Sequence, residues 1–145
     1  MSPPGDSPVS TGPPDRQTLR LLESHLADDP LVARTAFEPD GHEPRLLTAT
    51  LDSDQYPWVV ERARLDVRWF TSGDFSMHYV EATDDGTWEC RWDRHPNEHS
   101  PRLHFHRPPD CAETAGLSLP STHPLDVYGT VLAAVQDRIE TGWTE

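Results

Sequence analysis

An almost complete alternation of apolar and polar residues, followed further along the chain by an acidic turn, constrains the fold of this chain most. From Glu61 to Phe70 one side of the chain is apolar, while the other carries mainly arginine. Residues 75–83 and 87–93 form two further strand-like runs, and Asp84-Asp85-Gly86 between them is a strong hairpin signal. Alternate side chains of a strand point to opposite faces, so the pattern predicts an antiparallel sheet with one buried face. The residues of the first run expected on that face are Ala63, Leu65, Val67 and Trp69.

Helices are expected before and after these strands. Asp15 has the character of a helix N-cap ahead of leucines at helical spacing, and Pro30 ends that helix. Residues 31–38 and 45–52 resemble strands, and a last helix with an apolar stripe begins near Thr122 to Pro124. The predicted fold is α+β, with an antiparallel sheet of four to five strands packed against an N-terminal and a C-terminal helix.

Two segments are rich in proline. Residues 1–14 hold five prolines among Ser, Gly and Thr, a composition that cannot bury apolar surface. We therefore expect a disordered tail over residues 1–14 and a single domain over residues 15–145. Periodicity also fails from His95 to Pro120, where five further prolines predict one long loop.

The charge composition is typical of a protein that works in concentrated salt. Asp+Glu 25 against Lys+Arg 12 gives a net charge of -13, and every cation is arginine because lysine is absent. Acidic surfaces hold water in concentrated salt, where screening removes like-charge repulsion. No run approaches the roughly 18 apolar residues of a membrane helix, and no signal-peptide layout is present. We expect a soluble cytoplasmic protein of a halophilic archaeon, whose acidity does not exclude a nucleic-acid partner.

Histidine and arginine gather in one part of the chain. Five of the eight histidines lie within residues 75–109, together with four arginines. Over residues 86–109 these four arginines against three carboxylates give a local charge of +1 in an otherwise acidic chain. Imidazole titrates near neutral pH. This segment is therefore the part best equipped to bind an anion and to transfer protons.

The partner of His78 depends on the register of the predicted hairpin. A two-residue turn at Asp85-Gly86 would place His78 opposite Asp93, whose carboxylate would orient the imidazole and raise its basicity. A bulged turn that includes Asp84 would shift the register by one residue and place His78 opposite Trp92. Both registers stay open at this point, as does a solvated strand histidine without a special role.

The remaining histidines of this segment have spacings that occur in metal sites. His104 and His106 alternate on one face of a strand and could share a zinc ion with His95 or His99. Pro96 breaks the helix that the four-residue spacing of His95 and His99 would need, and no cysteine joins the set. Separately, Cys90 is predicted to be a buried thiol. The alternatives are a functional histidine set without metal and a solvated loop.

Five short motifs follow one another between Leu65 and Pro108. They are His78-Tyr79, an acidic turn with Gly86, Arg91-Trp92-Asp93, His95-Pro96 and His104-Phe105-His106. In this order they resemble the TumE-type toxin family of prokaryotic toxin–antitoxin systems, in which a Tyr-x-Tyr-His strand, an Arg-Tyr-Asp-Asn strand and a histidine-rich run recur. Trp92 stands in place of the family's tyrosine and Arg94 in place of its asparagine. The resemblance implies a growth-inhibiting protein encoded beside an antitoxin.

We therefore expect the toxin component of a toxin–antitoxin system, with a cognate antitoxin as partner and RNA as the target of a metal-independent ribonuclease. Cleavage through the 2′-hydroxyl of RNA needs a base, an acid and a cation at the phosphate, but no cofactor. The predicted catalytic residues are His78 as base, Asp93 as its holder, His104 or His106 as acid, and Arg91 at the phosphate. The alternatives are a non-catalytic module that binds a partner or nucleic acid, and a zinc protein built on the histidine loop.

Overall fold

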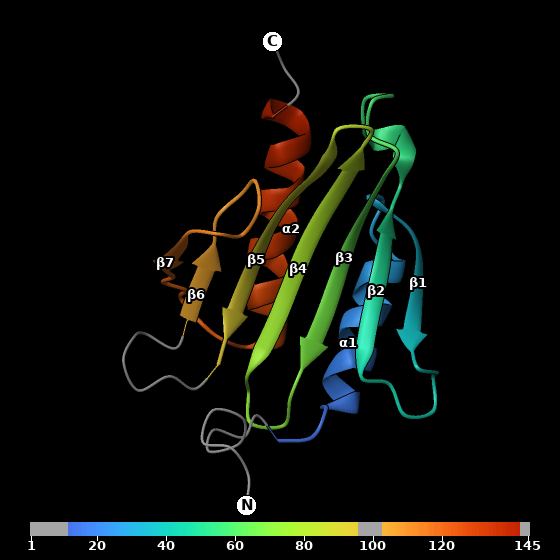
Figure 1. Ribbon diagram of the computed structural model, residues 1–145. Helices are drawn as coiled ribbons and strands as arrows, with labels where there is room; N and C mark the ends of the chain where they lie inside the picture. Colours follow the sequence, from blue (N-terminus) through green and yellow to red (C-terminus); the bar gives the residue numbers. More distant parts are fainter. Residues whose placement is uncertain (1–11, 96–102, 143–145) are drawn as a thin grey trace, which may run out of the picture.

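The computed structural model describes residues 12–95 and 103–142. Within these residues, seven strands form one antiparallel sheet in chain order, accompanied by two α-helices and one short 3-10 helix, η1 (Figure 1). The elements are α1 (Arg16–Ala27), β1 (Val32–Glu38), β2 (Leu46–Leu51), η1 (Ser53–Gln55), β3 (Arg62–Trp69), β4 (Phe75–Thr83), β5 (Gly86–Arg94), β6 (Leu103–His106), β7 (Thr114–Gly116) and α2 (Pro124–Thr141).

This architecture confirms the α+β class and the antiparallel sheet, but the expected four to five strands are too few. The additional strands, β6 and β7, lie in the segment that was expected to be one long loop. Pro108 and Pro109 follow β6 and Pro120 follows β7, so these prolines flank the strands instead of interrupting them. Proline weakens a strand only where its missing N–H is needed in the ladder, and short strands therefore survive between prolines.

Both α-helices lie on the same side of the sheet (Figure 1). The Asp15 carboxylate accepts a hydrogen bond from the Thr18 N–H at 3.0 Å, which confirms the predicted N-cap. The residues that the helices bury against the sheet are Leu19, Leu22 and Leu26 of α1 and Val127, Val131, Leu132 and Val135 of α2. Neither helix crosses the opposite side of the sheet, which we call the open face.

The burial of β3 follows the alternation in its sequence. Ala63, Leu65, Val67 and Trp69 are at most 3% exposed, while the arginines between them point to the open face. A period of two residues therefore predicted correctly which side of this strand enters the core.

The β4–β5 hairpin has a turn of two acidic residues. Thr83 pairs with Gly86, so Asp84 and Asp85 alone form the turn. Gly86 begins β5 with a φ of 133°, a backbone conformation that favours glycine because a Cβ atom would be strained there. The glycine thus belongs to the first position of the strand, not to the turn.

This turn sets a register that differs from both of the expected ones. His78 pairs with Arg91, so the expected partners Asp93 and Trp92 are both wrong. Asp93 lies opposite Ser76, one step along the open face. Because the turn is one residue closer to the N-terminus than Asp85-Gly86, each partner of β4 moves by two residues relative to the first expectation.

The predicted disordered tail falls mostly on residues 1–11, which lie outside the described residues. Its last residues contact the connection between β3 and β4: the Thr71 N–H donates to the Pro13 carbonyl at 2.9 Å, and Pro14 forms a bridge with Phe70. The single domain over residues 15–145 stays a prediction. Among the described helices, none has the length and apolar character needed to cross a membrane.

A buried ion pair fastens α2 to the sheet. Glu81 on β4 is 0% exposed, and its two carboxylate oxygens accept hydrogen bonds from the Arg138 guanidinium at 2.9 and 3.1 Å. The Tyr79 hydroxyl donates to the same carboxylate at 2.6 Å. Arg138 also lies 3.8 Å above the centre of the Trp88 ring. Every charge in this contact is therefore compensated, as a buried pair requires.

Replacing Arg138 with Met should lower the free energy of unfolding by about 3–5 kcal/mol, because it leaves the Glu81 carboxylate buried without a counter-charge. Chemical denaturation followed by circular dichroism measures this difference. The matched control, Arg34→Met, removes an exposed cation from β1 and should change stability by less than about 0.5 kcal/mol. Equal effects of the two substitutions would contradict a structural role for the pair.

Candidate functional site

A row of polar side chains crosses the open face. It consists of paired residues on four adjacent strands, namely Asp66, His78, Arg91 and His106. Their neighbours in the chain, such as Tyr79 and Cys90, are buried in the core. Because successive side chains of a strand alternate between faces, the row must point away from the helices.

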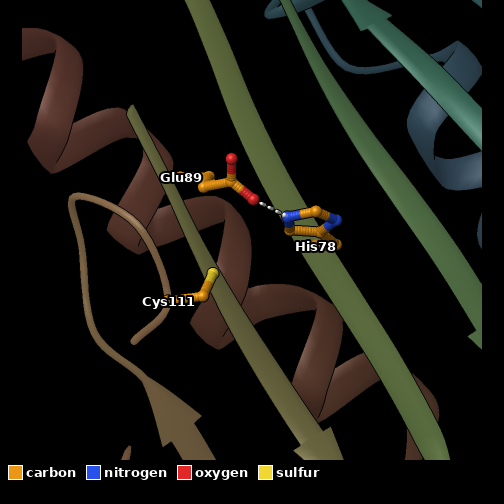
Figure 2. Close-up of side chains that lie close together, drawn as sticks. All are labelled: His78, Glu89 and Cys111. Carbon is orange, nitrogen blue, oxygen red and sulfur yellow. Dashed lines mark hydrogen bonds and ion pairs between the residues drawn. The ribbon is translucent and has the colours of Figure 1, made fainter. Parts of the chain in front are cut away.

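His78 forms a hydrogen-bonded pair with Glu89 (Figure 2). Its Nε2 lies 2.8 Å from Oε1 of Glu89, and the Thr87 hydroxyl donates to Oε2 of the same carboxylate at 2.9 Å. Burial raises the pKa of Glu89, but the hydrogen bonds from His78 and Thr87 outweigh this effect and hold the pKa below its usual value. An ionised Glu89 orients the imidazole, so that Nδ1 of His78 is the nitrogen able to take a proton.

A hollow of about 190 Å³ opens beside His78 on the open face. Its lining includes His78, the two arginines Arg68 and Arg91, and one acidic residue, Asp66. Guanidinium groups present paired N–H donors that match the oxygens of a phosphate. The hollow therefore combines a proton acceptor with two cations, of which Arg91 is held in place by Asp93.

Asp93 connects Arg91 with a second histidine. Its Oδ2 accepts a hydrogen bond from Nε of Arg91 at 3.0 Å and lies 2.9 Å from Nε2 of His106. The Asp93 side chain is only 7% exposed, so these contacts are protected from water. The carboxylate therefore holds a guanidinium and an imidazole side by side.

The tautomer of the neutral His106 ring follows from its hydrogen-bond partners. Arg91 can only donate, whereas the Asp93 carboxylate can only accept, and both lie within 3.1 Å of Nε2 of His106. The Thr114 hydroxyl lies 3.3 Å from Nδ1. With the proton on Nδ1, the ring accepts from Arg91 at Nε2 and donates to the Thr114 hydroxyl, which satisfies both ring nitrogens.

Two further histidines face the other oxygen of Asp93. Nδ1 of His104 lies 3.7 Å and Nε2 of His95 lies 3.9 Å from Oδ1, and the two rings stack with centroids 5.0 Å apart. His104 is the partner of Asp93 across the β5–β6 ladder. These separations are longer than hydrogen bonds.

The structure brings the five predicted site residues onto one face but divides them into two groups. Arg91, Asp93, His104 and His106 lie together on β5 and β6, whereas His78 forms its own pair on β4. The expected contact of His78 with Asp93 is absent from the described contacts, and Glu89 takes that place. His99 lies outside the described residues.

Sequence reasoning missed Glu89 and Cys111. Glu89 shares a face with Arg91, so a two-residue Asp84-Asp85 turn would have placed it near His78. Cys111 has a φ of 63°, uncommon for a residue other than glycine, and its sulfur lies within 4.8 Å of ligand atoms of His78 and Glu89 (Figure 2). By contrast, the prediction for Cys90 is confirmed: this thiol is 4% exposed, and burial raises its pKa to about 12.

Comparison with known proteins identifies the family. A family model described as Toxin TumE matches residues 18–139, which is most of the chain. The chain belongs to the TumE toxin family. No curated protein and no solved structure matches it significantly. The resemblance drawn from residues 65–108 is thereby confirmed and extends in both directions.

Membership in the TumE family gives this chain a toxin role. The matched span runs from the first turn of α1 to near the end of α2 and contains every residue of the two groups on the open face. The family description assigns no chemistry to those residues. A halophilic archaeal source stays a prediction from composition.

The pair of His78 and Glu89 should make stability depend on pH. A carboxyl group with a lowered folded-state pKa stabilises the fold above its unfolded pKa, and this contribution is lost as the pH falls through the folded value. Glu89→Gln should therefore be less stable than the wild type at neutral pH, and the difference should disappear well below pH 4.5. Denaturation curves over this range measure it. An exposed control, Glu113→Gln, should show no such convergence.

Proposed function

We propose that this toxin stops growth as an endoribonuclease that cleaves RNA through the RNA's own 2′-hydroxyl, with no metal ion at the reacting atoms. One observation carries the proposal: His78 and His106 flank Arg91 on three adjacent strands of the open face. Two imidazoles on either side of a guanidinium supply the base, the acid and the cation that this reaction needs.

His78 is the proposed general base. Its Nε2 is engaged by Glu89 at 2.8 Å, so Nδ1 would accept the proton of the 2′-hydroxyl. The carboxylate then stabilises the imidazolium that forms, as in other pairs of histidine and an acidic residue. Glu89 thus takes over the positioning role that the sequence had assigned to Asp93.

Arg91 is the proposed phosphate ligand. It lines the hollow beside His78, and its Nε is held by Asp93 at 3.0 Å. A guanidinium fixed in this way needs no reorganisation when charge develops on the phosphorane, which is the condition for effective electrostatic stabilisation. Arg68 adds a second cation to the same hollow and would bind a neighbouring phosphate oxygen.

His106 is the proposed general acid in its imidazolium form, which Asp93 stabilises from 2.9 Å and which gives one ring proton to the leaving 5′-oxygen. Strands in a sheet lie about 4.8 Å apart, so the backbones of His78 and His106 are separated by roughly 10 Å across β5. This spacing accommodates a phosphodiester between the two rings, with the attacking and leaving oxygens on opposite sides. His104 is only 6% exposed and faces Asp93, so its imidazole is less accessible to substrate than that of His106. Asp93 acts as a positioning residue for Arg91 and His106.

Replacing His78 with Ala should abolish growth arrest when the toxin is expressed in cells, and should lower RNA cleavage by about 10²–10⁴-fold, the usual contribution of a general base. The assay uses purified protein and total RNA in molar potassium chloride with EDTA present. His42→Ala, which removes an exposed histidine far along the chain from the site, should behave like the wild type.

The outcomes of this experiment separate the alternatives. Cells that still stop growing with His78→Ala would refute the assignment of the base. Cleavage that EDTA stops would contradict a metal-independent reaction. Growth arrest without RNA cleavage by the wild type would instead favour a non-catalytic toxin that binds its target.

A cognate antitoxin is the proposed protein partner, because the toxin role requires that the host be protected. We expect a small open reading frame beside the toxin gene. Its co-expression should restore growth, and its product should co-purify with this chain. If no neighbouring gene relieves the arrest caused by the wild-type toxin, this partner is wrong.

A further inference from the structure

The geometry points to a zinc site on the open face, formed by Oδ1 of Asp93, Nε2 of His95 and Nδ1 of His104. These three ligand atoms all lie within 4.8 Å of one another. The proposal goes beyond the ribonuclease reaction and does not depend on it, because the ion would be bound by residues that neither accept nor donate the reacting protons.

The spacing of the donor atoms fits a bound ion. Zinc binds nitrogen and oxygen at about 2.0–2.2 Å in tetrahedral geometry, which places two ligand atoms roughly 3.4 Å apart. Oδ1 of Asp93 lies 3.7 Å from the nitrogen of His104 and 3.9 Å from that of His95. Both distances exceed a hydrogen bond and come within about half an ångström of the separation that zinc would impose.

The hydrogen bonding of Asp93 also supports its role as a zinc ligand. Asp93 is 5% exposed, and its Oδ1 has no hydrogen-bond partner among the described residues, although Oδ2 is fully engaged by Arg91 and His106. A buried carboxylate oxygen without a partner is costly. A cation between Oδ1 and the two imidazoles would satisfy it.

A second cluster of metal-ligating residues on this face lacks that feature. His78, Glu89 and Cys111 also bring their ligand atoms within 4.8 Å of one another. However, both oxygens of Glu89 already accept hydrogen bonds, from His78 and from Thr87. Of the two clusters, only the one around Asp93 therefore contains a buried carboxylate oxygen without a hydrogen bond among the described residues.

The local structure explains why these residues converge. Asp93 and His104 are directly paired across β5 and β6, and His95 follows Asp93 by two residues, just beyond the end of β5. His106, which the sequence had grouped with His104 as a shared ligand, instead lies 2.9 Å from Oδ2 of Asp93 and hydrogen-bonds to Arg91. Two imidazoles and one carboxylate leave the fourth position of a tetrahedral ion open.

Metal analysis of the purified full-length protein tests the site directly. After exposure to zinc and gel filtration, the wild type should retain about one equivalent of zinc per chain. His95→Ala, which removes a 45% exposed side chain and so should leave the fold intact, should lower zinc affinity by about 100-fold in competition with a chromophoric chelator. Circular dichroism of each variant verifies folding.

Two control variants test whether zinc binds at Asp93, His95 and His104 and not elsewhere. His42→Ala and Cys111→Ser should bind zinc like the wild type. The site is refuted if the wild type holds less than about a tenth of an equivalent, or if His95→Ala and His104→Ala both bind zinc as tightly as the wild type. Loss of zinc in Cys111→Ser would also refute it, by moving the ion to the cluster around Glu89. Because His78→Ala should cleave RNA about 10²–10⁴-fold more slowly yet still bind zinc, the two proposals fail independently.

Discussion

The register of the β4–β5 hairpin is the constraint on which the open face depends. The two-residue turn at Asp84-Asp85 aligns His78 with Arg91, and β6 then continues the row with His106. A slip of one residue would exchange the two faces of a strand and direct these polar side chains into the core. The buried residues prevent such a slip, because Tyr79 and its neighbours in the core can occupy only the face covered by the helices.

Two buried carboxylates, one on each side of the sheet, differ in how completely their oxygens are hydrogen-bonded. On the core side, Glu81 is compensated by the two hydrogen bonds from Arg138 and one from Tyr79, and the pair joins α2 to β4. On the open face, Asp93 has one oxygen engaged by Arg91 and His106 and one without a hydrogen bond. Complete compensation is typical of a structural pair, whereas the incomplete compensation of Asp93 marks a place where a ligand would be bound.

The parts of the structure that could be predicted are those with a clear period. Alternation fixed the buried side of β3, and the leucines after Asp15 identified α1. Short β6 was missed because four residues carry too little periodic signal among prolines. The partner of His78 was missed because Gly86 was assigned to the turn, although its positive φ occurs at the start of β5. With the wrong register, Glu89 was not expected to lie near His78.

The chemical nature of the RNA ends produced by the toxin tests the central claim most directly. Attack by the 2′-hydroxyl, with His78 as base and His106 as acid, must leave a 2′,3′-cyclic phosphate on one fragment and a 5′-hydroxyl on the other. A substrate with a single 2′-deoxy substitution at the cleavage position should remain intact. Fragments that carry a 5′-phosphate and a 3′-hydroxyl, or cleavage of the 2′-deoxy substrate, would show that water is the nucleophile and would contradict the account.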